Sequence, residues 1–299
     1  MDTRELLLLS WFVGDGFGSQ TDGMDESEIE TLAIDSIDEV YTLEEIQPLC
    51  GQSGPPSDLS ILAGLSLIAL GQIDLDHVRS KYRTYEKESG AFSFPQKGDN
   101  ALSLTRAPIM ALLDERYPYT KWEAIARSET QITHSSSLAI EALLLVSRAF
   151  VLLMHEEADE AHQLAALLIK EVSKRGWNER LSVALRTAVN QKPLAEGSTK
   201  ESYQIITTIT TVFHTLLSGL PYEAGLESIA RRGGNSRLSG AIYSSLKSLV
   251  DGQAPPERFS AEIYPSPTLE AMIKSETLFR RETIKMENLA ERIARDLAT

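Results

Sequence analysis

The apolar stretch at residues 135–162, SSSLAIEALLLVSRAFVLLMHEEADEAH, constrains the fold more than any other part of the chain. It is apolar on nearly every side before it turns acidic, which is typical of a helix at the centre of a helical protein. Its most apolar part, 138–154, contains Glu141 and Arg148 and is too short for a comfortable membrane span. The stretch therefore predicts a buried core helix.

Helical spacing of apolar residues recurs through most of the rest of the chain. In residues 57–72, for example, Ile61, Leu65 and Ile68 fall on one face. Strands with alternating apolar residues are scarce. The other segments with helical spacing are 161–174, 178–190, 201–219, 223–231 and 239–251. The pattern predicts an all-α protein whose residues 1–299 form a single domain, with 266–299 as a C-terminal helical extension.

The charge balance disfavours one class of partner. The 299 residues include 29 basic and 43 acidic ones, for a net charge of −14. Such a surface repels phosphate backbones, so we expect no nucleic-acid binding. It could instead attract a basic protein partner, or it could simply keep the chain soluble. The segment 22–46 is especially acidic.

The N-terminus and the cysteine content indicate a cytoplasmic location. The run LLLLSWFVG at 6–14 resembles the core of a signal peptide, but Asp2 and Glu5 stand where a basic leader would be. A buried helix is the better interpretation, and we expect no membrane partner. The single cysteine, Cys50, excludes an internal disulfide and suits a reducing compartment.

Two short stretches place carboxylates where a ligand could be held. VGDGFGSQTD at 13–22 sets Asp15 and Asp22 around a glycine-rich bend, although ordinary turns use the same residues. PPSDLS at 55–60 sets Ser57, Asp58 and Ser60 at a helix N-terminus. Their oxygens could bind a hard cation, but helix capping also explains them.

The histidines give a weaker signal. His155, Asp159 and His162 would share one face of a continuous helix, which could bind a transition metal. A charged helix end exposed to solvent would look the same. His134 precedes the core helix, and a capping or structural role is its default interpretation.

The order of five pieces is more specific than any one of them. GDGFG, SDLS, GDNALSLTRAP, THSSSLAI and GGNSRLSGAIYSSL follow one another between residues 14 and 256. This series resembles the ADP-ribosylglycohydrolase family, which includes the dinitrogenase-reductase-activating glycohydrolases. The resemblance implies an orthogonal bundle of helices with a dinuclear magnesium site. It also implies an activity that removes ADP-ribose from arginine, serine or related acceptors, or that cleaves ADP-ribose derivatives.

The positions that the resemblance assigns to metal binding are poorly matched. The family's T-D-D-T stretch is Ser57, Asp58, Leu59 and Ser60 here, and Asp22 stands where a glutamate is expected. Its G-G-D-A-D-T motif reads Gly233, Gly234, Asn235, Ser236, Arg237 and Leu238. Leu59, Asn235 and Arg237 thus replace three of the four expected metal carboxylates.

The positions assigned to ligand contact are matched better. The loop NALSLTRAP at 100–108 is similar to the family's N-G-x-x-M-R-x-A-P, with Ala101 for glycine and Thr105 for arginine beside Arg106. Thr133 and His134 fit the family's T-H pair.

These departures predict that the family's magnesium is absent and no metal is bound. A cation at the old site would lose three attractive terms and meet the positive Arg237, and at ~4 Å each unit-charge pair is worth about 4 kcal/mol at an effective dielectric near 20. We expect the Arg237 guanidinium to fill the vacated ion position and to pair with Asp58.

The leading functional hypothesis is a pseudoenzyme that binds an ADP-ribose-like or nucleotide ligand without turnover. One alternative is a protein-interaction role, such as an immunity protein or a regulator that blocks an ADP-ribosyltransferase through the acidic surface or the C-terminal helix. A second is a metal-independent ADP-ribosyl hydrolase with Asp22 or Asp58 as the catalytic base. The predicted ligand-binding residues are Asp15, Ser57, Asp58, Asn100, Arg106, His134, Gly233, Gly234, Asn235 and Arg237.

Overall fold

The fold is built almost entirely from helices. A computed structural model describes residues 1–31, 51–70, 74–90, 94, 99–192, 194, 204–261, 263–275 and 285–298. Within these ranges no β-sheet forms, and one isolated bridge joins Gln52 to Tyr264. The predicted all-α class is confirmed. The elements are α1 (Thr3–Gly18), α2 (Glu26–Thr31), α3 (Pro55–Leu70), α4 (Leu75–Ser89), η1 (Ala101–Arg106), α5 (Ala107–Leu112), α6 (Tyr119–Thr130), α7 (Ser137–Met154), α8 (Ala161–Arg175), α9 (Glu179–Val189), α10 (Gln204–Leu217), α11 (Tyr222–Arg232), α12 (Ser236–Asp251), α13 (Glu257–Ser260), α14 (Pro267–Ser275) and α15 (Met286–Ala298).

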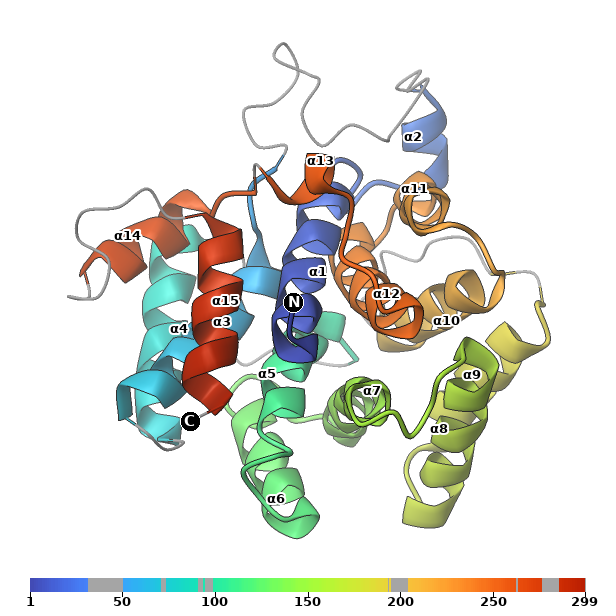
Figure 1. The fold of residues 1–299 in the computed structure, drawn as a ribbon, viewed down its shortest axis with the longest axis horizontal. Coiled ribbons are helices and arrows are strands. Elements are labelled where there is room, and N and C mark those ends of the chain that lie inside the picture. Colours follow the sequence, from blue (N-terminus) through green and yellow to red (C-terminus); the bar gives the residue numbers. More distant parts are fainter. Residues whose placement is uncertain are drawn as a thin grey trace.

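The predicted core helix is α7. The expectation that the run is too short to cross a membrane was wrong, because the helix is long and apolar enough. The core position is nevertheless confirmed, since 78% of the helix is buried inside the fold. It packs against α5, η1, α6, α8 and α12. Figure 1 shows α1 near the middle of the molecule, with α3, α4, α14 and α15 on one side and α10, α11 and α12 on the other.

Helices α1 and α12, far apart in the sequence, touch through small residues. A Cβ on Gly14 would lie 2.1 Å from Gly240 O, and one on Gly18 would lie 2.3 Å from Ser236 O. Ser236 Oγ donates a hydrogen bond to Gly18 O at 2.7 Å, and Ser244 Oγ donates one to Ser10 O at 2.6 Å. This close backbone contact therefore explains the glycines and serines at these positions of the two helices.

The glycine-rich stretch at 13–22 is not a bend over most of its length. Helix α1 continues to Gly18, so Asp15 lies inside a helix and all of α1 from Leu6 onward is buried. The expectation of a bend was wrong because Gly14 and Gly18 serve the contact with α12 instead of a turn.

The C-terminal helix packs on the body. Met286, Leu289, Ile293 and Leu297 are all buried against a surface that includes α1 and α3. Each such side chain contributes about 1.5–3 kcal/mol when it is fully buried. The apolar face of α15 is therefore not free to receive a protein partner.

Some predictions fall on residues outside the described ranges. These are Cys50 and most of the acidic segment 22–46. The cytoplasmic location stays a prediction.

Candidate functional site

The guanidinium of Arg237 points inward from the start of α12. Its Nη1 lies 2.9 Å from Asp15 Oδ1, and the two side chains are 16% and 0% exposed. Nη1 also donates to Gln52 O at 3.3 Å. Burial lowers the pKa of Arg237, but the neighbouring Asp15, Asp22 and Asp58 outweigh that effect and raise it, so the side chain is a fixed cation.

The other oxygen of Asp15 is held by the start of α3. Asp15 Oδ2 accepts hydrogen bonds from the backbone N–H groups of Gly54, at 2.8 Å, and Ser57, at 3.1 Å. First-turn N–H groups have no partner within their own helix, and the positive end of the helix dipole favours an anion there. A Cβ at residue 54 would lie 2.6 Å from Arg237 Nη1, so a side chain there would push the guanidinium out of its present position.

Asp58 is bound by three hydroxyl groups. Ser53 Oγ donates to its Oδ1, while Tyr85 OH, at 2.7 Å, and Ser266 Oγ donate to its Oδ2. The side chain is fully buried. Burial raises the pKa of Asp58 to about 6, although the three hydrogen bonds oppose the shift. The predicted pair between Arg237 and Asp58 is wrong, because these hydroxyls hold Asp58 and the guanidinium goes to Asp15.

A cavity of about 300 Å³ opens beside this ion pair. Asp22, Asn100, Asn235 and Arg237, all predicted site residues, lie on its wall. Asp22 is an exposed residue whose Oδ1 accepts a hydrogen bond from the backbone N–H of Arg237 at 3.2 Å. The full lining is Asp22, Pro55, Pro56, Asn100, Leu102, Thr105, Gln204, Asn235, Arg237 and Leu238.

The twin glycines position the loop that carries Asp22. Gly233 has a φ of +63°, and a Cβ there would lie 2.2 Å from Met24 O. Gly234 N donates to Met24 O and Gly23 N donates to Gly234 O, both at 2.7 Å. This double contact sets the path of the chain after α1, which carries Asp22. Neither glycine lines the cavity, so their observed role is to position the loop.

Two predicted ligand-binding residues lie in a separate buried network. Arg106 is fully buried, with its Nε 3.1 Å from Glu129 Oε1 and its Nη2 2.6 Å from Thr133 Oγ1. His134 Nδ1 lies 2.8 Å from the same Thr133 hydroxyl, and its Nε2 has no hydrogen-bond partner. Burial and then the charge of Arg106 lower the pKa of His134 to about 3, so the imidazole is neutral. Neither residue lines the cavity.

The remaining candidates have structural roles. Ser57 presents its backbone N–H to Asp15, while its Oγ is buried without a partner. Asn100 Oδ1 accepts from Leu102 N at 2.8 Å and so caps η1, although the residue also lines the cavity.

The shared helical face that His155, Asp159 and His162 would need to bind a metal does not form. Helix α7 ends at Met154, so His155, Asp159 and His162 do not share one helical face. His155 instead lies 3.6 Å from Asp114.

Several residues at the site were not predicted from the sequence. Tyr85 and Ser266 bind Asp58 from distant segments, and Gln204 lines the cavity from the start of α10. No local pattern marks them, because each is an ordinary polar residue that the fold brings close.

The arrangement does not suit a magnesium ion. Magnesium prefers carboxylate oxygens and water in octahedral geometry. Here both oxygens of Asp15 and both of Asp58 already accept hydrogen bonds, and a guanidinium lies at Asp15. Among the described residues, no group of three or more His, Cys, Asp or Glu side chains could hold a metal ion.

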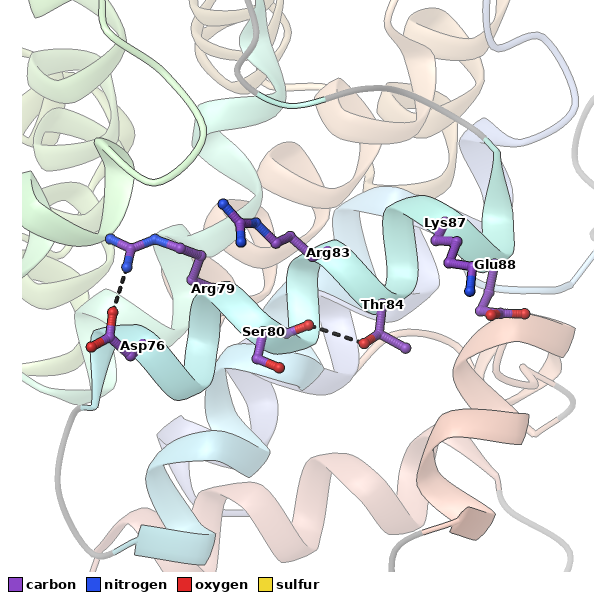
Figure 2. Close-up of a pocket in the computed structure, with 7 residues that line it drawn as sticks. All are labelled: Asp76, Arg79, Ser80, Arg83, Thr84, Lys87 and Glu88. Carbon is purple, nitrogen blue, oxygen red and sulfur yellow. Dashed lines mark hydrogen bonds and ion pairs between the residues drawn. The ribbon is translucent and has the colours of Figure 1, made fainter.

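A larger hollow, of about 520 Å³, lies on the outer face of α4. Figure 2 shows that its lining side chains all come from this one helix, with Arg79 paired to Asp76. None of them is a predicted site residue, and a single exposed helix face lacks the convergent groups of a ligand site. The smaller cavity beside Arg237 is therefore the candidate site.

Comparisons with known proteins give one family match and a similar fold. A family model described as ADP-ribosylglycohydrolase matches residues 7–294. Among solved structures, the chain is similar to one described as an "ADP-ribosylglycohydrolase-related protein complex", with a TM-score of 0.73, 18% sequence identity, and coverage of 99% of this chain and 98% of that chain. At this identity the structural likeness shows the fold alone. No curated protein matches the chain by sequence.

Proposed function

The chain belongs to the ADP-ribosylglycohydrolase family, and we propose that it binds an ADP-ribose-like or nucleotide ligand in the cavity beside Arg237. Binding needs no metal ion, and the ligand is not hydrolysed. The observation that carries the proposal is the ion pair between Arg237 and Asp15. In this pair, the charged guanidinium of Arg237 lies against the Asp15 carboxylate, in the region where the family resemblance implies magnesium.

The cavity offers suitable contacts for such a ligand. Its volume of about 300 Å³ is at the lower end for small-molecule sites. The Asp22 carboxylate and the Asn235 amide can hydrogen-bond the hydroxyl groups of a ribose. The exposed edge of the Arg237 guanidinium can donate to a phosphate oxygen. Pro55 and Leu102 supply an apolar side for a sugar or a base.

The same geometry argues against hydrolysis. A catalytic base must lie within hydrogen-bonding reach of the water that it activates. Asp58 is fully buried, is occupied by hydroxyl donors and does not line the cavity. Among the residues that the structure describes, Asp22 is the one carboxylate on the cavity wall, so the alternative of a metal-independent hydrolase depends on Asp22 there.

The protein-interaction alternative loses one of its supports. The apolar face of α15 is buried on the body, so it cannot offer that face to a partner while it stays docked. The acidic surface remains as an argument, and this role stays a prediction.

Calorimetry on the full chain tests the proposal directly. ADP-ribose, ADP and NAD are titrated with magnesium and with a chelator, and we expect at least one to bind equally well in both. Asn235→Trp fills the cavity and should abolish the heat. Val183→Trp is the matched control, because Val183 is 53% exposed on α9.

Three results would count against the proposal. Absence of heat with all three compounds contradicts ligand binding. Binding that requires magnesium contradicts the loss of the metal. Release of ADP-ribose from an ADP-ribosyl-arginine or ADP-ribosyl-serine substrate contradicts the absence of turnover, and Asp22→Asn then tests the remaining base.

A further inference from the structure

Ser266 connects the C-terminal part of the chain to Asp58. It stands just before α14, and its Oγ donates to Asp58 Oδ2 while accepting from Leu269 N at 3.1 Å. Its backbone N–H donates to Ser53 Oγ at 2.9 Å, and Ser53 Oγ in turn donates to Asp58 Oδ1. One serine is thus tied twice to the same carboxylate, directly and through Ser53.

The residues before Ser266 lie along the loop that precedes α3. Ser53 N donates to Tyr264 O at 2.8 Å, and Tyr264 N donates to Gly51 O at 3.0 Å. Gln52, between them, gives its carbonyl to Arg237. The same short loop therefore contacts both the C-terminal segment and the guanidinium of the site.

We call residues 263–275 the strap. Its apolar side chains Ile263, Leu269 and Ile273 are buried, and α14 packs on α4. The strap is also hydrogen-bonded to the start of α15, since Met286 N donates to Ile263 O at 3.0 Å. Figure 1 shows α14 and α15 lying beside α4 and α3. Docking of the strap is thus linked to docking of the last helix.

The carboxylate of Asp58 is bound by hydroxyl groups from three segments. The hydrogen bonds to its two oxygens come from Ser53, Tyr85 and Ser266, and each belongs to a different segment. A carboxylate has about four lone-pair positions, so three donors nearly fill it. About one lone-pair position of Asp58 is left, so a group that needs more than one contact with this carboxylate must displace a hydroxyl.

We propose that the Asp58 carboxylate holds the C-terminal strap in its docked position by accepting the Ser266 hydroxyl group. Loss of the Ser266–Asp58 contact loosens the strap as a unit. Undocking of the strap is the step that would expose Asp58 to solvent or to a ligand. This inference does not depend on whether the neighbouring cavity binds a ligand, so the two proposals can fail separately.

Amide hydrogen exchange on the full chain, followed by mass spectrometry, tests the strap. Ser266→Ala removes the direct hydrogen bond, and a hydrogen bond to a charged group is worth enough to speed exchange of amides in 263–275 about 10- to 100-fold. Ser260→Ala is the matched control, because Ser260 lies on α13 and contacts Glu257 O instead of Asp58. Amides of α8 and α9 report whether the whole fold has been destabilised.

A second variant separates the carboxylate from the helix cap. Ser266→Ala also removes the acceptor of Leu269 N, whereas Asp58→Asn leaves that cap intact. The proposal requires faster exchange throughout the strap in both variants, with α8 and α9 unchanged. It is overturned if only Ser266→Ala speeds exchange, if neither variant does, or if Asp58→Asn speeds exchange equally in α8 and α9.

Discussion

Arg237 Nη1 lies 2.9 Å from Asp15 Oδ1, so the second residue of α12 is paired with a carboxylate inside α1. The Asp15 side chain is fully buried, and that of Arg237 is partly buried. Each charge is tolerated in the interior only because the other is there, together with the backbone donors at the start of α3. The pair therefore links two helices that are already in close contact at Gly14 and Gly240.

Removing the guanidinium should be costly. Arg237→Met leaves Asp15 buried with two N–H donors but no cation, and we expect the free energy of unfolding to fall by about 3–5 kcal/mol. Urea denaturation measures this loss. Asp15→Asn combined with Arg237→Met should recover part of it, because no charge is then left unpaired.

Arg231→Met is the matched control. Arg231 pairs with Glu227 on the exposed side of α11, and its side chain is 45% exposed. An exposed pair of this kind contributes about 0–1 kcal/mol. If Arg237→Met were no more destabilising than Arg231→Met, the buried pair would not have the role assigned to it.

The helices and the family were predictable from the sequence, and the partner of Arg237 was not. Helix α7 is apolar nearly all round, and the order of the five glycine- and serine-containing pieces is long enough to identify the family. The sequence also indicated that Arg237 points inward. The predicted partner, Asp58, was wrong, because hydroxyl groups from three separate segments hold Asp58 and leave Asp15 to the guanidinium.

The C-terminal end of α1 was also predicted wrongly from the sequence. Glycines favour turns when they are judged locally, so 13–22 was expected to bend. In the fold, Gly14 and Gly18 are needed because another helix backbone lies against them. A tertiary contact thus overrides a local preference, and no pattern within ten residues reveals it.

The contact between α1 and α12 predicts opposite outcomes for two neighbouring glycines. Gly14→Ala would place a Cβ 2.1 Å from Gly240 O, so the helices must separate, and we expect a loss of about 1–3 kcal/mol or more. Gly16→Ala meets nothing closer than 3.8 Å and gains helix propensity, so it should be neutral or stabilising by up to about 1 kcal/mol. Thermal unfolding of both variants gives the comparison, and equal effects would show that the close approach is not required.

Asp58 should make stability fall as the pH rises. Its pKa is raised by burial from 3.8 to about 6, so the folded state holds the proton more tightly than the unfolded chain. This contribution is fully present below pH 3.8 and is lost as the pH rises through about 6. Relative to Asp58→Asn, the free energy of unfolding of the wild type should fall by about 3 kcal/mol as the pH rises through that range. A constant difference between the two proteins from pH 4 to 7 would contradict the raised pKa.

His134 should make stability fall as the pH falls, the opposite of Asp58. Burial and the charge of Arg106 lower its pKa from 6.5 to about 3, so the unfolded chain takes up the proton first as the pH falls. Its contribution is fully present above pH 6.5 and is lost progressively toward pH 3. His134→Asn keeps a polar group near the Thr133 hydroxyl but cannot titrate. Relative to this variant, the free energy of unfolding of the wild type should fall by about 1.4 kcal/mol for each pH unit below 6.

Urea denaturation of both proteins at several pH values measures this slope. A slope near zero would mean that His134 is protonated in the folded protein, and the unpartnered Nε2 would then need a hydrogen-bond acceptor that the buried network does not supply.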